Sequence, residues 1–318
     1  MFSYFFSFLI AFFTLLTIGN TENAFSNKTT KNQNFNMQIK QSDTTGIIAA
    51  GATLQLVSNQ FAFTEGPAVD KAGNLFFTDQ PNDKIWQCKL DGSLSVFLEK
   101  SGRSNGLYLD TAGNIIACAD EKNEVWCISP SKKITVLYQA PESRRLNGPN
   151  DLWIDAAGGI YLTDPYYQRP YWTRKKPVLE KENVYYLPHG KKKLMVVDDK
   201  LKQPNGIVGT PDGRHLFVAD IGDNKTYKYE IQPDGRLKNR TLFVEKGSDG
   251  MTLDANGNLY ITGDGVTVFD ADGKEIEHIA VPAKWTGNVC FAGKDKETLF
   301  ITASEALYTL QMNVAGVE

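Results

Sequence analysis

A short pattern that recurs along the chain constrains its fold more than any other feature. Each copy is the end of one apolar run, a turn rich in Asp, Gly and Asn, and a second apolar run. These turn residues supply the positive φ angles that tight hairpins need. The copies are AVDKAGNLFFTD (68–79), YLDTAGNIIACAD (108–120), WIDAAGGIYLTD (153–164), VGTPDGRHLFVAD (208–220), TLDANGNLYITGD (252–264) and FAGKDKETLFITA (291–303).

Further strand-like runs follow the turns, such as KIWQCKL and LSVFLEK after the first copy. Each unit therefore contains about four short strands, with no convincing amphipathic helix between them. Four antiparallel strands repeated at this period describe a propeller blade. Six copies predict an all-β fold, a six-bladed β-propeller with four-stranded antiparallel blades. A β-sandwich or barrel does not explain so regular a period.

The sixth unit contains only three strand-like runs, GNVCFAG, TLFITAS and ALYTLQM. We expect the outer strand of the last blade to come from the N-terminal segment ATLQLVS, residues 52–58. Such a closure joins the two ends of the ring and removes an open sheet edge.

The N-terminus differs from the rest of the chain. Residues 1–20 are almost wholly apolar and carry no charged side chain, and residues 21–45 are polar and aperiodic. We interpret 1–20 as a signal peptide, 21–45 as a disordered leader and 46–318 as the catalytic propeller. The signal peptide predicts a secreted or periplasmic protein whose mature domain does not contact a membrane. Because no Lys or Arg precedes the apolar run, a membrane anchor stays as the alternative.

Composition excludes some functions and leaves others open. The net charge is −3 and no long basic run occurs, so nucleic-acid binding is not expected. The four cysteines match no zinc pattern. In a hairpin that turns near 122–123, Cys118 and Cys127 would lie opposite each other and could pair in an oxidising compartment. Nothing in the sequence decides the oligomeric state.

Each predicted innermost strand begins with a polar pair. Innermost strands line the channel of a propeller, so equivalent positions meet at one mouth of that channel. Asn-Gly and Asp-Gly also form ordinary turns. Six pairs in phase, one of them with a Glu that turns disfavour, favour a shared site. The pairs are Glu65-Gly66, Asn105-Gly106, Asn150-Asp151, Asn205-Gly206, Asp249-Gly250 and Asn288-Val289.

The residue types in this ring predict a metal site. They supply carboxylate and amide oxygens, which suit Ca²⁺, Mg²⁺ or Mn²⁺ better than Zn²⁺. Glu65 and Asp249 balance one divalent charge, and Asn150 and Asn205 add neutral oxygens. We expect one divalent cation, with Ca²⁺ first and Mg²⁺, Mn²⁺ or Zn²⁺ as alternatives.

Several segments together resemble the SMP-30/gluconolactonase/luciferin-regenerating enzyme family, and its bacterial gluconolactonase branch most. The resemblance covers about residues 50–312 and implies a six-bladed propeller that hydrolyses a sugar lactone. The segments are FTEGPAVD, SNGLYLD, RLNGPNDLWID, IYLTDPYY, QPNGIVGTPDGRHLFVAD, SDGMTLDANGNLY and GNVCFAGKDKETLFITAS.

The resemblance also implies roles for particular residues. The family's metal ligands match Glu65, Asn205 and Asp249, and Asn150 would lie by the metal or contact substrate. Asn105 resembles a residue on the substrate side. Asp249 would also serve as general base, while the metal polarises the lactone carbonyl.

Residues 166–183, YYQRPYWTRKKPVLEKEN, depart from the simplest family pattern by being longer, basic and aromatic. We expect this loop to lie over the channel mouth, where Tyr166, Tyr167 and Arg169 bind substrate. Tyr171 and Trp172 would also bound the pocket. A solvated loop is the alternative.

Other functions stay open on the sequence. One is a non-catalytic propeller that binds carbohydrate or protein around a structural metal, and another is a hydrolase of other lactones, esters or phosphoesters. GRSNG, residues 102–106, fits the G-x-S-x-G pattern of serine hydrolases. That pattern needs a strand, a sharp turn and a helix, whereas LYLD here reads as a strand. Ser104 is therefore not expected to be a nucleophile.

Overall fold

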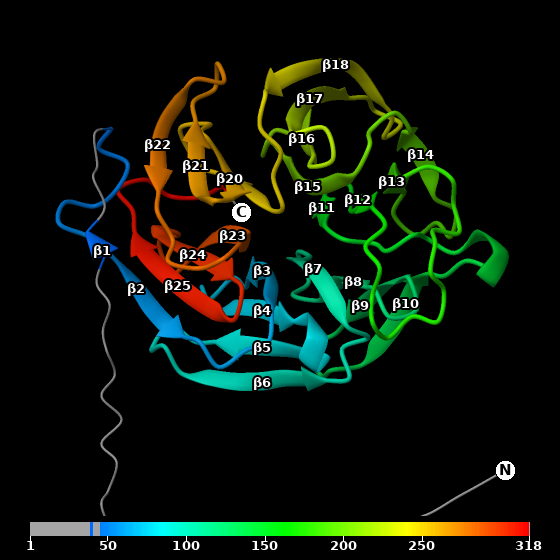
Figure 1. Ribbon diagram of the computed structural model, residues 1–318, viewed down its shortest axis with the longest axis horizontal. Helices are drawn as coiled ribbons and strands as arrows, with labels where there is room; N and C mark the ends of the chain where they lie inside the picture. The colour runs from blue at the N-terminus through cyan, green and yellow to red at the C-terminus, as the bar shows by residue number, and fades with distance from the viewer. Residues whose placement is uncertain (1–38, 41–44, 318) are drawn as a thin grey trace, which may run out of the picture. The chain divides into compact units, whose positions relative to one another are not determined.

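The computed structural model describes residues 39–40 and 45–317. The predicted signal peptide and most of the predicted leader lie outside the described residues. The described chain forms six sheets, arranged around a central axis as blades (Figure 1). The predicted six-bladed propeller is confirmed.

In blades 1 to 5 the first strand in the sequence is innermost, and later strands follow outward. Blade 1 contains β3 (Thr64–Val69), β4 (Leu75–Asp79), β5 (Lys84–Cys88) and β6 (Leu94–Glu99). Blade 2 contains β7 (Ser104–Leu109), β8 (Ile115–Ala119), β9 (Glu124–Ile128) and β10 (Ile134–Tyr138). Blade 3 contains β11 (Leu152–Ile154), β12 (Ile160–Asp164), β13 (Asn183–Leu187) and β14 (Met195–Asp198).

The remaining blades follow the same order. Blade 4 contains β15 (Pro204–Gly209), β16 (His215–Asp220), β17 (Lys225–Ile231) and β18 (Leu237–Val244). Blade 5 contains β19 (Met251–Leu253), β20 (Leu259–Gly263), β21 (Gly265–Phe269) and β22 (Glu275–Ile279). Blade 6 begins with β23 (Thr286–Ala292), β24 (Thr298–Ala303) and β25 (Ala306–Gln311).

Blade 6 closes the ring with strands from the other end of the chain. β2 (Thr53–Ser58) pairs antiparallel with β25, with Gln55 opposite Thr309. The blue β2 accordingly lies beside the red β25 in Figure 1. The predicted closure is confirmed, and β1 (Ile39–Lys40) adds a fifth strand outside β2.

Apolar side chains fill the spaces between neighbouring blades. Tyr260 of blade 5 meets Phe291 of blade 6 edge to face, with ring centroids 5.2 Å apart. Phe61 meets Phe77 and Trp86 in the same way near the junction of blades 6 and 1. Burying one such side chain contributes about 1.5–3 kcal/mol. Because the core lies between blades, the ends of the innermost strands are free to carry polar residues.

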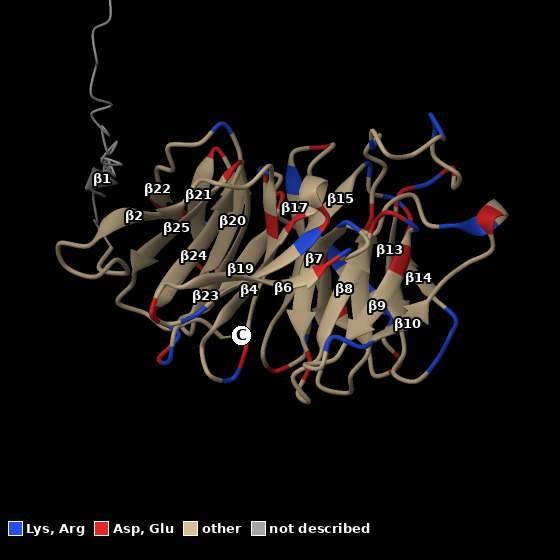
Figure 2. Ribbon diagram, turned by 90° about the horizontal axis from the view of Figure 1, so that it is seen from below, with Lys and Arg blue, Asp and Glu red and all other residues tan. Residues whose placement is uncertain are grey.

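Charged residues of both signs gather on the loops at the two edges of the propeller (Figure 2). The only helices in the described residues are the 3-10 turns Gln80–Asn82 and Glu142–Arg144. Neither is long or apolar enough to cross a bilayer.

The cysteine prediction is wrong in its register. The hairpin forms as expected, with Asn123 at a φ of 59° in the turn. Cys127 pairs with Ile116, however, and Cys118 pairs with Val125. The two cysteines are therefore diagonal rather than opposite, and all four cysteines are free thiols.

Candidate active site

Strand pairing arranges the polar residues of the channel mouth in two tiers. Thr163, Thr262 and Thr302 of the second strands lie level with Asp151, Gly250 and Asn288. Asp151 and Asn288 therefore lie one step below the level of Asp249. We call the upper level the first tier: Glu65, Asn105, Asn150, Asn205, Asp249 and Gly287.

This register shifts the polar pair predicted for blade 6, Asn288-Val289, by one residue. Gly287, and not Asn288, is equivalent to Asp249. Two threonine hydrogen bonds between neighbouring blades support the equivalence. Thr78 Oγ1 donates to the carbonyl of first-tier Asn105 (3.0 Å), and Thr262 Oγ1 donates to that of Gly287 (2.8 Å).

The first-tier carboxylates of Glu65 and Asp249 repel each other electrostatically. Glu65 is only 4% exposed. Burial raises its pKa well above the ordinary value, and the nearby carboxylates of Asp249 and Asp151 raise it further. Desolvation raises the pKa of Asp249 to about 6, opposed by hydrogen bonds from Trp285 and Asn205. The indole Nε1 of Trp285 lies 2.5 Å from Asp249 Oδ2.

Two amide oxygens of the first tier are buried without a donor. Asn105 Oδ1 and Asn205 Oδ1 have no hydrogen-bond partner in the described part of the chain. The amide nitrogen of Asn205 donates to the Tyr167 hydroxyl (2.9 Å), which leaves the oxygen of Asn205 free. Asn150 is also buried. An unmet buried acceptor costs about 1–3 kcal/mol.

These donors fit a hard divalent cation. Two mutually repelling carboxylates and orphaned amide oxygens are what such an ion would neutralise and satisfy. Within residues 45–317, no three His, Cys, Asp or Glu side chains form a metal-binding group by themselves. A cation here would therefore need the amide oxygens beside Glu65 and Asp249.

The level below the first tier, which we call the second tier, contains Asp151 and Asn288 and supports Glu65. Asn288 Nδ2 donates to Asp151 Oδ2 (3.3 Å), and the Asn288 side chain also hydrogen-bonds Glu65. Burial raises the pKa of Asp151 to about 7. Glycines make room for this packing: a Cβ at Gly287 would lie 2.8 Å from Glu65 Oε1, and one at Gly106 would lie 2.4 Å from Asp151 Oδ1.

The loop 165–182, which we call the lid, joins β12 to β13 and reaches the first tier. Its Tyr167 contacts Asn205, as described above. Arg169 Nε donates to the buried Asp120 Oδ2 (2.7 Å), which also accepts from the Tyr171 hydroxyl (2.7 Å) and Gln80 Nε2 (3.1 Å). Burial raises the pKa of Asp120, and the guanidinium of Arg169 opposes that rise.

Other lid residues pack against the lid itself. Tyr166 stacks on Trp172 with ring centroids 6.1 Å apart, and its hydroxyl donates to Gln168. Trp172 is buried and donates to the carbonyl of Glu121 (3.1 Å). The structure thus brings Tyr167 and Arg169 toward the first tier, while Tyr166 and Trp172 hold the lid together.

Sequence reasoning missed the roles of Asp151, Asp120 and Trp285. Asp151 carried a signal, because the third polar pair has Asp where four others have Gly. Trp285 carried none, since it belongs to blade 6 and meets Asp249 only through the fold. It is 38% exposed at the mouth.

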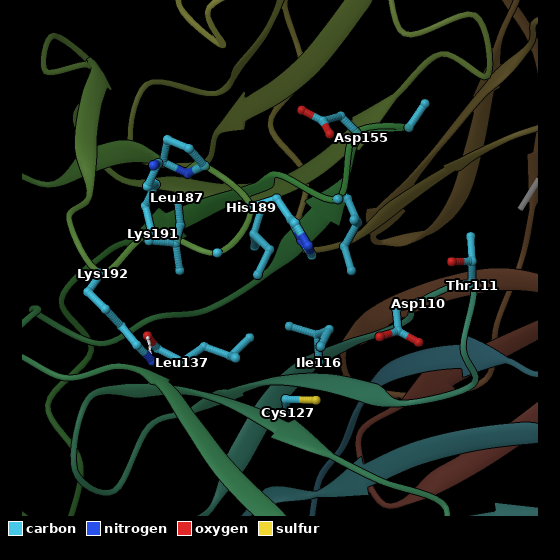
Figure 3. A pocket seen from close by; sticks show the side chains of 16 residues that line it. Asp110, Thr111, Ile116, Cys127, Leu137, Asp155, Leu187, His189, Lys191 and Lys192 are labelled. Carbon is cyan, nitrogen blue, oxygen red and sulfur yellow. Dashed lines mark hydrogen bonds between the residues drawn. The ribbon is translucent and has the colours of Figure 1, made fainter.

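Two other features are not candidates for this chemistry. Ser104 is fully buried at the start of β7 and donates to the carbonyl of Ser101 (2.7 Å), so it is no nucleophile. A cavity of about 350 Å³ between blades 2 and 3 is lined by aliphatic side chains and Cys127, with Asp110, Asp155, His189 and two lysines at its edges (Figure 3). It contains no first-tier residue, and Lys192 closes one side of it by donating to the carbonyl of Leu137.

The fold and the mouth define a class, a six-bladed propeller with an oxygen-rich site at one end of its channel. The chain belongs to the family described as SMP-30/Gluconolactonase/LRE-like region, whose model matches residues 63–305.

Individual relatives agree with this assignment. The chain is 26% identical to the gluconolactonase of Zymomonas mobilis, over 85% of this chain and 84% of that one. It is 24% identical to the diisopropyl-fluorophosphatase of Loligo vulgaris, over 78% and 88%. It is also similar to the solved structure of a gluconolactonase from Xanthomonas campestris, with a TM-score of 0.78, 27% identity and coverage of 86% and 94%.

Proposed function

We propose that this protein is a lactonase that opens a sugar lactone at the channel mouth with the help of one divalent cation. The observation that carries the proposal is the first tier itself: Glu65 and Asp249 beside the orphaned oxygens of Asn105 and Asn205. The gluconolactonases among the relatives support the reaction type.

Glu65, Asn205 and Asp249, with Asn150 beside them, would hold the cation. We expect Ca²⁺ first, with Mg²⁺, Mn²⁺ or Zn²⁺ as alternatives, because the donors are carboxylate and amide oxygens. When bound, a divalent cation supplies a Lewis acid for the lactone carbonyl.

The residues of this chain carry the remaining steps. Asp249 has a pKa raised to about 6 by desolvation, so near neutral pH it can take a proton from the attacking water. The water oxygen bonds to the carbonyl carbon, and the ring C–O bond breaks. Asp249 then returns its proton to the leaving alkoxide, which yields the open hydroxy acid. Asn105 and Asn150 orient lactone hydroxyls, and Tyr167 and Arg169 border the substrate.

Acid release from gluconolactone, followed with a pH indicator, tests the proposal. The protein is assayed after EDTA treatment and again with Ca²⁺, Mg²⁺, Mn²⁺ or Zn²⁺ restored. We expect hydrolysis above the spontaneous rate only with a cation present. Cation binding without turnover of a panel of lactones, esters and phosphoesters would instead indicate a binding protein. No cation binding at all would reject the site.

We also propose that residues 1–20 direct the propeller to a secreted or periplasmic location. The apolar run and its polar leader support this reading. N-terminal sequencing of protein isolated from its source tests it: a start after residue 20 indicates cleavage, whereas an intact Met1 in a membrane fraction indicates an anchor.

A further inference from the structure

The lid holds one cation whose hydrogen-bonding capacity is only partly used. Arg169 donates through Nε to Asp120, and its other guanidinium N–H groups donate to no residue in the described part of the chain. The side chain is 20% exposed, whereas that of Asp120 is 1% exposed. Asp120 therefore fixes the direction of the guanidinium from behind and leaves its outer edge free.

That free edge belongs to the neighbourhood of the first tier. The Arg169 Cζ lies 5.5 Å from the ring centroid of Tyr167, whose hydroxyl contacts Asn205. A molecule bound at the first tier would therefore have Arg169 beside it.

A cavity of about 690 Å³ lies between the lid and blades 1 and 2; Arg169 lines it, and no first-tier residue does. Phe63, which lines it, is two residues before Glu65. The lining contains two arginines and no acidic residue: Phe63, Gln80, Pro81, Arg103, Gln168, Arg169, Pro170 and Tyr171.

The second arginine, Arg103, strengthens the positive charge of the cavity. Its Cζ lies 4.5 Å from the Tyr171 ring centroid, and its Nη1 donates to the carbonyl of Pro81 (2.6 Å). Glu121 Oε1 lies 3.8 Å from Arg103 Nε and is 43% exposed, so this ion pair offsets the charge of Arg103 only in part. Asp120 pairs closely with Arg169, whereas the only carboxylate paired with Arg103 among the described residues is the more distant Glu121.

Arg174, on the same lid, is different. Its guanidinium Cζ lies 3.7 Å from the Trp172 ring centroid, and it donates to the carbonyl of Asn147. It does not line the cavity. Arg174 Nε and Nη1 also lack hydrogen-bond partners among the described residues, but they are buried within the lid, whereas Arg169 lines the cavity.

We propose that this cavity binds an anionic group of the substrate, so that the lactone carries an acid group on the end remote from its carbonyl. The inference rests on the proposed lactonase function and names its substrate class. A guanidinium presents a planar pair of N–H donors that matches two oxygens of one anion. Carboxylate, sulfonate and phosphate groups all offer such a pair.

The test compares kcat and KM for gluconolactone with those for lactones of the same ring size that end in a carboxylate, a sulfonate or a phosphate. We expect kcat/KM for at least one acidic lactone to exceed that of gluconolactone by about tenfold or more, the weight of one charge-assisted hydrogen bond. The arm with the highest value identifies the acid group.

Variants then assign the preference to Arg169. Arg169→Gln should lower the ratio of acidic to neutral kcat/KM by about tenfold, mainly through KM, and Arg169→Lys should restore part of it. The matched control, Arg174→Gln, should leave the ratio unchanged even where it lowers both rates. Equal turnover of acidic and neutral lactones, or an equal loss on both in Arg169→Gln, would overturn the inference.

Failure of the lactonase proposal is separable from failure of this one. If no lactone is hydrolysed, calorimetry with glucarate and gluconate still tests the cavity. Tighter binding of glucarate than of gluconate would support the anion site, provided that Arg169→Gln removes the difference. Equal binding of the two acids would reject the site.

Discussion

Both ends of the innermost strands carry acidic residues, but the carboxylates at the two ends differ in how many hydrogen-bond donors they receive. At the far end, Asp70 Oδ1 accepts from the backbone N–H groups of Ala72 and Asn74, and its Oδ2 accepts from Asn74 Nδ2, all at 2.9 Å. Asp254 repeats this arrangement in blade 5 and adds the Tyr260 hydroxyl (3.0 Å). The hydrogen bonds that close these turns satisfy the acceptor capacity of both carboxylates.

At the mouth, the carboxylates receive fewer donors. Glu65 accepts from the backbone N–H of Gly66 (3.1 Å) and from Asn288, and Asp249 accepts from Trp285 and Asn205. Neighbouring carboxylates and orphaned amide oxygens complete the tier. The difference shows that a repeated acidic residue does not mark a site by itself; unmet capacity to bind a proton or a cation does.

The largest expected effect comes from Asp249→Asn. It replaces the charge of a proposed cation ligand with a neutral amide and removes the proposed base, so hydrolysis should fall by at least about 100-fold. Cation affinity measured by calorimetry should fall with it. The fold should persist, because the amide has the same shape and relieves repulsion with Glu65. Asp254→Asn, at the far end of the same strand region, is the control and should keep its rate per folded molecule. Retained hydrolysis in Asp249→Asn would remove this residue from the chemistry.

Removal of the cation should act on the mouth alone. EDTA should reduce hydrolysis to the spontaneous rate and lower the melting temperature. Restoring the ion at about 100 times its Kd should add about 2.7 kcal/mol to the free energy of unfolding. Asn205→Ala should weaken that stabilisation. Melting that is indifferent to every ion would contradict the proposed ligand set.

A substitution at the far end should lower stability and leave hydrolysis unchanged. Asp70→Ala leaves the two backbone N–H groups and the Asn74 amide of its turn without their acceptor. The free energy of unfolding should fall by about 1–3 kcal/mol. Urea unfolding measures the loss, and hydrolysis by the folded protein should be kept. A loss of activity without a loss of stability would show that this end also serves function.

The buried carboxyl groups of the mouth should make the stability of the cation-free protein fall as pH rises toward neutrality. Desolvation and burial raise the pKa of Asp249 to about 6 and that of Asp151 to about 7, against about 3.9 in an unfolded chain. At pH values between the unfolded and folded pKa of each carboxyl group, the folded state binds more protons than the unfolded state. The free energy of unfolding therefore falls as pH rises from about 4 to 7. Urea unfolding in EDTA at several pH values measures the slope, which excess cation should flatten. A slope of the opposite sign would contradict the burial of these carboxyls.

The smallest effect should come from Trp285→Phe, which removes the N–H donor to Asp249. The pKa of Asp249 should rise, and the acid limb of the pH–rate profile should move up by less than about one pH unit. Trp86→Phe, whose indole N–H has no hydrogen-bond partner in the described chain, is the control. An unmoved limb would separate Trp285 from the titration of Asp249.

The sequence alone determined the blades, the closing strand and most of the first tier. Turn chemistry and the period-2 alternation of strands are local, so each unit shows its own pattern in the sequence. Glu65, Asn105, Asn205 and Asp249 begin equivalent strands, and the symmetry of a propeller brings such positions together.

Only the tertiary structure decided how these residues are partnered. Asn288 reaches Asp151 across 137 residues, Arg169 reaches Asp120 across 49, and Trp285 reaches Asp249 across 36. Register also placed Gly287 rather than Asn288 in the first tier and set Cys118 diagonal to Cys127. A one-residue offset in pairing changes which side chain faces a neighbour, and no local pattern specifies it. Unmet donors and acceptors are likewise a property of the packed neighbourhood and cannot be read from one strand.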